Sequence, residues 1–434
     1  MITRIEAYRY RCFEGLTLEI GPFQVLVGKN GAGKSTLLDI PILLGEILTQ
    51  KTIHDPFFRP SPSHARPRAD APLDLIFNHR GDWFSLAVEC RLPDQIMGSL
   101  RRTTYEAASK SLKQKYDKQA GRLPGGLRYE LGVRIVSGAL EVSHEFLFIL
   151  PEDRSLLSLN INGLWGDQAE EDDSVRCIIR RTVVDAPRIR SEVPGSLKEI
   201  RGNVPPSTPA LSGLLLDVDL FAASNWLQSY FSRESLPILL DLPMMRQAQL
   251  PPGRDWRVAA NGSTLPWSVM ELGSDPERYE EWIAHVQSAL PLVESVEGRT
   301  REDDGLAYLE VGYSDGLKVK SSGLSDGTLS ILALTILPFL KNVPTFVAVE
   351  EPENGIHPKA IEAVLESLSK VPQSQVWVST HSPVAVAHTS PEHLLCMRQT
   401  RGEGVQVTRG SEHPKLREWQ GTPSLATLFA AGVL

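Results

Sequence analysis

The stretch Gly28-Lys29-Asn30-Gly31-Ala32-Gly33-Lys34-Ser35-Thr36 decides the fold class of this 434-residue chain. It matches the pattern G-x-x-x-x-G-K-[ST]. An apolar run typical of a buried strand, Phe23–Val27, comes just before it, and a helical pattern, Ser35–Leu48, follows it. A strand, a glycine-rich loop and a helix in this order predict an α/β fold whose parallel sheet carries a phosphate-binding loop.

The residue types in this loop, the P-loop (28–36), suit ATP and Mg²⁺. Small residues let backbone N–H groups wrap a chain of phosphates. We expect the ammonium group of Lys34 to reach the β and γ phosphates and the hydroxyl of Ser35 to bind Mg²⁺. A chance glycine-rich turn is the alternative, and the flanking strand and helix argue against it. The expected nucleotide-binding residues in the loop are Gly28, Asn30, Gly31, Ala32, Gly33, Lys34, Ser35 and Thr36.

Two carboxylates follow a second apolar strand in the run Phe346-Val347-Ala348-Val349-Glu350-Glu351-Pro352-Glu353-Asn354-Gly355-Ile356-His357-Pro358. Ligands of a parallel α/β sheet bind at the carboxyl ends of its strands. We therefore expect Glu350 to hold Mg²⁺ and Glu351 to orient or deprotonate an attacking water. Two acids at a solvated strand end are the alternative, which the P-loop disfavours.

Two more segments complete the candidate site. The signature segment, Ser321-Ser322-Gly323-Leu324-Ser325-Asp326-Gly327-Thr328, precedes an apolar helix. Its Ser325 and Gly327 suit a phosphate cradle at a helix N-terminus, with a simple helix cap as the alternative. The run Val376-Trp377-Val378-Ser379-Thr380-His381-Ser382-Pro383 ends a buried strand, and we expect His381 within reach of the γ-phosphate rather than held only by its own loop.

Hydrophobic patterns outside these motifs predict further elements. Strands are expected at 2–10, 16–20, 83–91 and 345–349, and a hairpin at 127–150 that turns at Ser137-Gly138. A second hairpin is expected at 306–313 and 316–319. Helices are expected at 97–123, 211–230, 276–290, 329–340 and 358–370, and the Pro- and Arg-rich stretch 187–209 is expected to be irregular.

Composition and charge narrow the class of protein. The formal net charge of −8 excludes a protein that is basic overall, so nucleic-acid contact would need a local basic patch. The four cysteines are far apart and form no CxxC, which argues against a metal site or a disulfide framework. The N-terminus lacks the pattern of a signal peptide, and no apolar run is long enough to span a membrane, so we expect a cytoplasmic protein without membrane contact.

The four motifs stand in the order of the ABC ATPase superfamily: Walker A, signature, Walker B and switch histidine. The runs at 350–358 and 379–383 resemble most closely the RecF/SMC-like and OLD-like branch, which carries "EEPENGLHP" and "STHSP", and Tyr10-Arg11-Cys12-Phe13 is similar to that branch's opening. The resemblance covers roughly residues 1–45 and 320–390. It implies an ABC-type P-loop ATPase head with a mixed or parallel sheet, an N-terminal antiparallel β lobe and a helical insertion.

Domain boundaries and the oligomer follow from the same resemblance. We expect residues 1–95 and 321–434 to form the two parts of the head, and residues 96–320 to form an inserted helical and β lobe. The resemblance implies a homodimer in which Ser325–Gly327 of one copy contacts the γ-phosphate on Lys34 of the other, with Asn354–His357 along the seam. Two residues depart from the usual pattern, because Glu350 replaces an Asp and Asp326 replaces a Gly. The second departure puts a negative charge near a phosphate.

Two basic clusters offer DNA contacts, with solvated surface as an equal alternative. The first spans 98–128 and the second 176–190, with no interleaved aromatics that would read bases. The first contains Arg101, Arg102, Lys110, Lys113, Lys115, Lys118, Arg122 and Arg128; the second contains Arg176, Arg180, Arg181, Arg188 and Arg190.

The segment after Ser382 contains no Asp, so we expect no nuclease domain of the TOPRIM kind that OLD-like nucleases carry. The apolar end, 425–434, is expected to pack on its own core or to dock a partner. The best hypothesis is a regulatory ATPase of a bacterial anti-phage defence system with a separate effector, such as a nuclease. A RecF-like repair ATPase is the alternative, and a transporter subunit is the third hypothesis.

Overall fold

The chain forms two compact units, each assembled from segments that are distant in sequence. Unit 1 comprises Met1–Gly21, Ile40–Arg233 and Gln399–Gln406, and unit 2 comprises Pro22–Asp39, Glu234–Arg398 and Val407–Leu434. The division expected from the sequence cuts the chain into the consecutive segments 1–95, 96–320 and 321–434. That division stays a prediction. The computed structural model describes residues 1–61, 66–157, 163–171, 174–193, 199–201, 203–213, 217, 220–254, 256–400, 402–416 and 424–432.

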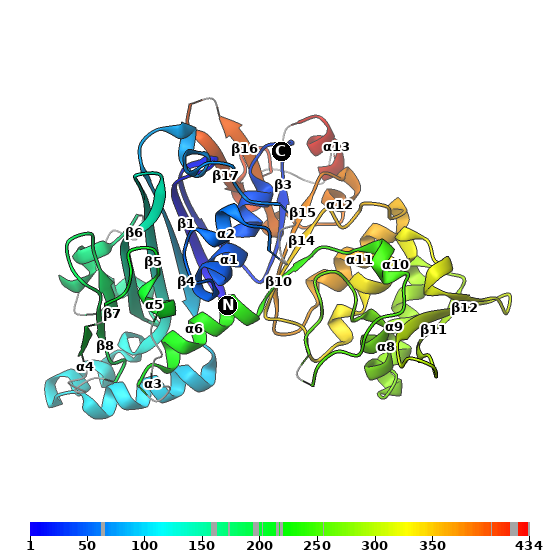
Figure 1. Ribbon diagram of the computed structural model, residues 1–434, viewed down its shortest axis with the longest axis horizontal. Coiled ribbons are helices and arrows are strands. Elements are labelled where there is room, and N and C mark those ends of the chain that lie inside the picture. Colours follow the sequence, from blue (N-terminus) through cyan, green and yellow to red (C-terminus); the bar gives the residue numbers. More distant parts are fainter. Residues whose placement is uncertain are drawn as a thin grey trace. The chain divides into compact units, whose positions relative to one another are not determined.

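Unit 1 is built on an eight-stranded sheet in the order β2-β1-β4-β5-β6-β7-β8-β9 (Figure 1). Every neighbouring pair in it is antiparallel. Ser137 and Gly138 have φ of 50° and 81°, which suits the tight turn predicted between β5 and β6. The strands are β1 (Ile2–Tyr10), β2 (Phe13–Glu19), β4 (Trp83–Arg91), β5 (Pro124–Val136), β6 (Ala139–Pro151), β7 (Arg176–Arg181), β8 (Arg188–Arg190) and β9 (Glu199–Arg201).

The helices of unit 1 correct two predictions. The single helix expected at 97–123 is two helices, because Ser109 starts a new one by accepting the N–H of Leu112 at 3.3 Å. The helix expected at 211–230 begins at Ala222 instead, after one short turn. The helices are α2 (Asp55–Phe58), α3 (Asp94–Ala107), α4 (Lys110–Lys118), α5 (Ala210–Gly213) and α6 (Ala222–Arg233), and α1 (Lys34–Thr49) has residues in both units.

The prediction that the stretch 187–209 is irregular is wrong where the stretch forms strands. The stretch contains β8 and β9, which pair with each other and extend the sheet from β7. Each is only three residues long, so neither shows a hydrophobic alternation long enough to detect in the sequence. The 194–198 part of this stretch and residue 202 lie outside the described residues.

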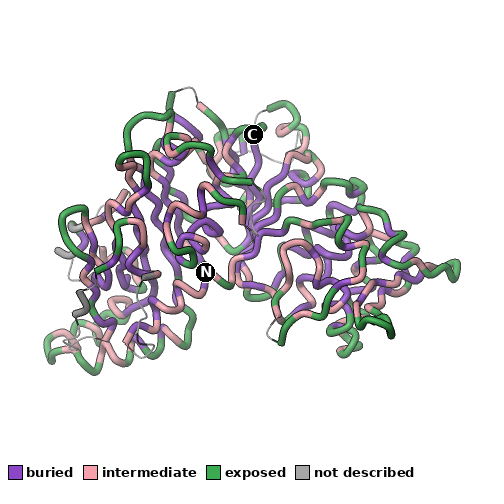
Figure 2. Tube along the Cα trace, in the orientation of Figure 1, coloured by how far each residue is buried: buried purple, intermediate pink, exposed green. Residues whose placement is uncertain are grey.

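Unit 2 is built on a largely parallel sheet in the order β10-β14-β15-β3-β16-β17. The pairings β10–β14, β14–β15, β15–β3 and β3–β16 are all parallel. Its central strands appear buried in Figure 2, as the predicted apolar runs require. The strands are β3 (Phe23–Val27), β10 (Ser235–Ile238), β14 (Phe346–Glu350), β15 (Gln375–Thr380), β16 (Leu394–Thr400) and β17 (Gly404–Arg409), of which β16 and β17 have residues in both units.

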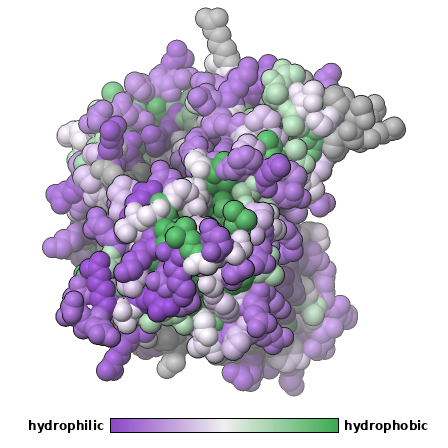
Figure 3. All heavy atoms as spheres, turned by 90° about the vertical axis from the view of Figure 1, so that its right-hand side faces the viewer, coloured by the Kyte–Doolittle hydropathy of each residue, from purple (hydrophilic) through white to green (hydrophobic). Residues whose placement is uncertain are grey.

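Helices α10 and α11 share a hydrophobic core with this sheet. Ile331 and Leu334 from α10 and Val364 from α11 cluster with Val25 of β3 and Val347 of β14. On the face that Figure 3 presents, hydrophobic side chains gather in a patch among hydrophilic ones. The helices are α7 (Leu242–Met245), α8 (Leu265–Leu272), α9 (Pro276–Ala289), α10 (Asp326–Thr335), α11 (Pro358–Ser369), α12 (Pro383–Ala387) and α13 (Leu425–Ala430).

A separate three-stranded antiparallel sheet in unit 2 confirms the second predicted hairpin. It consists of β11 (Val293–Thr300), β12 (Ala307–Tyr313) and β13 (Lys318–Lys320). With its parallel sheet, an antiparallel lobe at the N-terminal end of the sequence and helical parts, the chain has the expected α/β class. Within the described part of the chain, no helix combines the length and the apolar character needed to cross a membrane.

Candidate nucleotide-binding site

Three neighbouring strands of unit 2 bring the predicted site residues to one edge of the sheet. In the order β14-β15-β3, Glu350 pairs with Ser379, and Thr380 pairs with Val27. The P-loop follows β3, Glu351 follows β14 and His381 follows β15, so all three lie at adjacent carboxyl ends. Residues separated by more than 300 positions therefore share one site, as the strand-end argument predicted.

Glycines let the P-loop adopt a conformation that other residues resist. Gly31 and Gly33 have φ of 78° and 83°, in the left-handed region that L side chains rarely occupy. A Cβ atom on Gly28 would lie 2.3 Å from the carbonyl oxygen of Met397, which leaves no room for a side chain. The loop ends as α1 begins, where the first-turn N–H groups have no partner within the helix. These features make a cradle of backbone donors for an anion.

Lys34 is buried beneath this loop and is 6% exposed. Its Nζ donates hydrogen bonds to the carbonyl oxygens of Gly28 at 2.9 Å and of Lys29 at 3.2 Å. Burial lowers the pKa of Lys34, and the carboxylates of Glu351 and Glu350 oppose that shift. The same two acids that the sequence assigned to this site therefore act electrostatically on the lysine.

Glu351 occupies a backbone conformation that is rare for a residue with a side chain. Its φ is 45°, and its N–H donates to the carbonyl oxygen of Ser379 at 2.9 Å. Its Oε2 accepts a hydrogen bond from Asn354 Nδ2 at 2.9 Å, and its Oε1 lies 3.5 Å from Nε2 of His381. The neighbouring Glu350 is exposed at the end of β14. Strained backbone of this kind persists where the surroundings fix it, commonly at functional sites.

Glu353 lies in the same run as Glu350 and Glu351, and the structure places it against the segment that carries His381. Its Oε1 accepts the hydroxyl of Thr380 at 2.6 Å and the backbone N–H of His381 at 2.9 Å. Thr380 in turn accepts the N–H of Ser382 at 2.9 Å. Among the described residues, the buried Oε2 of Glu353 has no hydrogen-bond partner. The position of the acid, three residues after Glu350 in the same run, was the available signal.

The signature segment forms a capped helix start within unit 2. Ser325 Oγ accepts the N–H of Thr328 at 3.2 Å, as an N-cap residue does. A Cβ atom on Gly327 would lie 2.6 Å from the carbonyl oxygen of Gly355, so the segment packs against the loop that follows Glu351. In the part of the chain that is described, Ser325 makes no hydrogen bond with the P-loop. Asp326, the departure from the usual pattern, forms an ion pair with Arg246.

Helix α13 lines a pocket beside the P-loop that the sequence did not indicate. The pocket has a volume of about 510 Å³ and includes Lys29, Asn30, His381, Phe429 and Gly432 in its lining. Leu425 of α13 is buried, and Phe429 is partly buried against the core of the parallel sheet. The apolar end thus packs on its own core as far as the described residues show; Val433 and Leu434 lie outside them.

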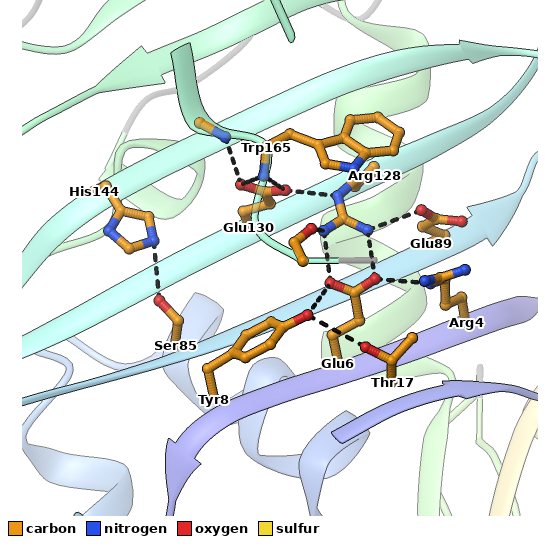
Figure 4. Close-up of polar contacts among 12 residues, drawn as sticks. Arg4, Glu6, Tyr8, Thr17, Ser85, Glu89, Arg128, Glu130, His144 and Trp165 are labelled. Atoms are coloured by element: carbon orange, nitrogen blue, oxygen red, sulfur yellow. Dashed lines mark hydrogen bonds and ion pairs between the residues drawn. The ribbon is translucent and has the colours of Figure 1, made fainter. Parts of the chain in front are cut away.

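Arg128 is buried, so it is not available for the DNA contact that the sequence predicted for the first basic cluster. Its guanidinium is 0% exposed and forms ion pairs with Glu6, Glu89 and Glu130 at 2.8, 2.8 and 2.6 Å (Figure 4). It also lies 4.4 Å from the ring centroid of Trp165. Burial alone would lower the pKa of Arg128, but the three carboxylates raise it above its ordinary value. Arg128 is therefore part of the interior of unit 1.

The second basic cluster is also largely engaged within unit 1. Arg181 is 5% exposed and donates to the carbonyl oxygens of Thr208 and Pro205. Arg176 donates to the carbonyl oxygen of Ser191 at 2.6 Å, and Arg180 forms an ion pair with an aspartate. By contrast, the basic residues of α4 lie on an exposed or half-exposed helix: Lys110, Lys113, Lys115 and Lys118.

A known family matches part of the chain. Residues 225–387 match a family described as "AAA domain, putative AbiEii toxin, Type IV TA system". This segment contains the signature segment, the two carboxylates and His381, but it is less than half of the chain. It therefore covers three of the four motifs that the structure gathers in unit 2.

One curated relative and several solved structures are also similar. An OLD nuclease from Thermus scotoductus (strain ATCC 700910 / SA-01) is 42% identical over 48 residues, which are 11% of this chain and only 9% of that protein. An Smc head bound to the C-winged helix domain of ScpA is 12% identical, with a TM-score of 0.49, covering 94% of this chain and 97% of that chain. An Smc head derived from Pyrococcus furiosus is 12% identical, with a TM-score of 0.48, covering 96% and 98% of the two chains.

The sequence match and the geometry agree on the kind of protein. The AAA-domain match covers the strand that carries Glu350 and the strand that precedes His381. The P-loop lies on the neighbouring strand of the same parallel sheet. The four motifs, the sheet that positions them and the AAA-domain match together support an ATPase of the ABC type.

Proposed function

We propose that this chain binds MgATP on its P-loop and hydrolyses it between two copies of itself. One observation carries the proposal: Lys34, Glu350, Glu351 and His381 meet at the carboxyl ends of three adjacent parallel strands. A buried cation, a pair of carboxylates and a histidine in one place are the groups that phosphoryl transfer to water requires.

The residues present fit a magnesium nucleotide. Gly31 and Gly33 turn the P-loop through left-handed conformations, and Lys34 donates hydrogen bonds to the backbone carbonyl oxygens of Gly28 and Lys29. Ser35 is exposed in the first turn of α1, and Glu350 is exposed at the end of β14. Ser35 and Glu350 would hold Mg²⁺, which would neutralise charge on the phosphates. Lys34 would bind the β and γ phosphates.

Glu351 and His381 are proposed to act on the attacking water and the γ-phosphate. Asn354 donates to one carboxylate oxygen of Glu351 and so orients the carboxylate. In that orientation Glu351 would accept a proton from the water. His381, fixed at its backbone by Glu353, would donate to the phosphate as charge develops on it.

We propose a second copy because, among the described residues, the signature segment makes no hydrogen bond with the P-loop of its own chain. Ser325 and Gly327 form an exposed or half-exposed helix start, where N–H groups and the helix dipole favour an anion. We propose that these residues reach the nucleotide held on Lys34 of the other copy. Asn354–His357 would then lie along the seam between the copies.

For the biological role, we propose a cytoplasmic regulatory ATPase in a bacterial anti-phage defence system, working with a separate effector such as a nuclease. Two comparisons support it: the matching family is described as a putative AbiEii toxin of a type IV toxin–antitoxin system, and the matching relative is an OLD nuclease. The lysines of α4 favour a second candidate, a RecF-like ATPase that binds DNA in repair.

A phage challenge separates these candidates. Cells carrying the gene and its genomic neighbours should resist phage infection, and Lys34→Ala should remove the resistance. Co-purification with the products of adjacent genes should recover an effector protein. Sensitivity to DNA damage without any change in phage plating, upon loss of the gene, would favour the repair candidate and overturn the defence role.

A further inference from the structure

Arg246 contacts the signature segment at three points, although it is far from it in sequence. Its Nε donates to the carbonyl oxygen of Leu324 at 3.2 Å, and its Nη2 forms an ion pair with Asp326. Its own carbonyl oxygen accepts the hydroxyl of Ser321 at 3.3 Å. These contacts span the segment from its first residue to the first residue of α10.

The backbone of Arg246 is itself held by α7. Asp241 caps this helix by accepting the N–H of Met244 at 2.9 Å, and the N–H of Arg246 donates to the carbonyl oxygen of Leu242 at 3.2 Å. The neighbouring Met245 is buried in the same core cluster as Leu324 of the signature segment. The backbone that carries the guanidinium of Arg246 is therefore held in place within unit 2.

Gly355 supports the other side of the signature segment. Its carbonyl oxygen leaves no room for a side chain at Gly327. Ser325, between the contacts of Arg246 and the contact of Gly327, is left exposed, with its hydroxyl on the Thr328 N–H. The fold thus fixes both flanks of the serine and leaves the serine itself accessible.

Charge gives Arg246 a second effect. The carboxylate of Asp326 is 56% exposed, one residue from the serine proposed to face a phosphate. A phosphate approaching that carboxylate would be repelled. The guanidinium of Arg246, 30% exposed, balances this charge where the repulsion would arise. Asp326 still suits the N-terminus of α10, because helix dipoles favour acids there.

From these contacts we infer that Arg246 is a positioning residue, which shapes the signature segment and cancels the charge of Asp326 so that Ser325 can meet the ATP bound to a second copy. The inference rests on the proposed composite site. It assigns Arg246 an effect on the partner's nucleotide and none on the nucleotide of its own P-loop. A merely structural role of Arg246 would not affect the partner's nucleotide while leaving the nucleotide on its own P-loop unaffected.

The first test compares Arg246→Ala with a matched arginine. Arg257 lies in the same unit and pairs with Glu234 at 2.6 Å, away from the signature segment. Arg246→Ala should leave the Kd for ATP unchanged and lower MgATP turnover by at least about tenfold, while Arg257→Ala changes neither. Arg246→Lys should recover part of the turnover, and adding Asp326→Asn to Arg246→Ala should recover part as well, because the uncompensated charge is removed.

The second test asks whether the effect passes between copies. Lys34→Ala protein, which is expected not to bind ATP, and Arg246→Ala protein, which is expected to turn over slowly, are mixed and assayed for turnover. A mixed dimer has one site with an intact P-loop and an intact partner segment, so the mixture should exceed the sum of the separate activities. A mixture no better than that sum, or Arg246→Ala with normal turnover, would overturn the inference. Wild-type protein without MgATP turnover would instead overturn the proposed function itself.

Discussion

Nε2 of His381 lies 3.5 Å from Oε1 of Glu351, although the two residues follow different strands. Each is also held from its other side. Asn354 donates to the second oxygen of Glu351, and Glu353 accepts the backbone N–H of His381. The acid and the histidine of the candidate site are therefore oriented by neighbouring residues of the protein, which is the condition for efficient chemistry at a fixed site.

Replacing Lys34 should abolish ATP binding. Lys34→Ala removes the buried ammonium group at the P-loop, and charge-assisted bonds to phosphate are among the strong ones, so we expect a loss of about 100-fold or more in affinity. Isothermal titration calorimetry with MgATP measures it. Lys341→Ala, an exposed lysine of the same unit, is the matched control and should bind normally. Near-normal affinity in Lys34→Ala would show that the P-loop assignment is wrong.

Thr380 should support turnover through Glu353. Thr380→Val keeps the shape of a buried strand residue but loses the hydroxyl that Glu353 accepts at 2.6 Å. We expect a stability loss of about 1–3 kcal/mol by denaturant unfolding, with lower kcat and an unchanged Kd for ATP. Thr389→Val is the control, because Thr389 is also buried and donates its hydroxyl to the carbonyl oxygen of Ala385. It should lose stability without losing turnover; equal kcat losses in both variants would refute a specific effect.

Arg128 should be essential for the stability of unit 1. Arg128→Met leaves three carboxylates buried without their shared cation, so unfolding free energy should fall by about 3–5 kcal/mol. Arg102→Met, on the exposed face of α3, should change it by less than about 0.5 kcal/mol. Chemical denaturation measures both, and similar values for the two variants would contradict the buried network.

The same network sets a direction for the pH dependence. Burial raises the pKa of Glu89, but bonds from Arg154 and Arg128 outweigh it and lower the folded-state pKa below 4.5. Its stabilisation is therefore present above pH 4.5 and lost as the pH falls through the folded value.

The lysines of α4 provide a direct test of DNA contact. Reversing Lys110, Lys113 and Lys115 to Glu should weaken DNA binding and reduce the dependence of log K on log salt, by up to about 0.9 per lost phosphate contact. Fluorescence anisotropy over a salt series measures this. Reversal of Lys318, Lys341 and Lys370 in unit 2 changes the net charge equally and should have little effect. Equal losses in the two triple variants would indicate a non-specific charge effect.

Local signals in the sequence predicted the parallel sheet and its site because the motifs follow buried strands directly. Phe23–Val27, Phe346–Val349 and Val376–Ser379 are apolar runs with little ambiguity, and each delivers its polar residues at its end. Short strands such as β8 and β9 give no such signal, and their pairing is settled by the rest of the sheet.

Long-range partners account for what the sequence could not show. The charge of Arg128 favours a place on the surface of the protein. Arg128 is instead buried, where it pairs with Glu6 and Glu89, which are distant in the chain. The role proposed for Arg246 depends on its ion pair with Asp326, which is distant in sequence. Helix α13, from the opposite end of the sequence, lies beside the P-loop. Such contacts depend on tertiary packing, which local periodicity does not contain.

The mass of the Glu351→Gln protein with MgATP tests the central claim most directly. Loss of the proposed general base should slow turnover by about 10²–10⁴-fold while leaving ATP binding intact, so the ATP-bound dimer should accumulate. Static light scattering should then give twice the 48.0 kDa of one chain with MgATP, and the monomer mass without nucleotide or with Lys34→Ala added. A protein that binds ATP but stays at the monomer mass, or one that still hydrolyses ATP at the wild-type rate, would contradict a composite site with Glu351 as its base.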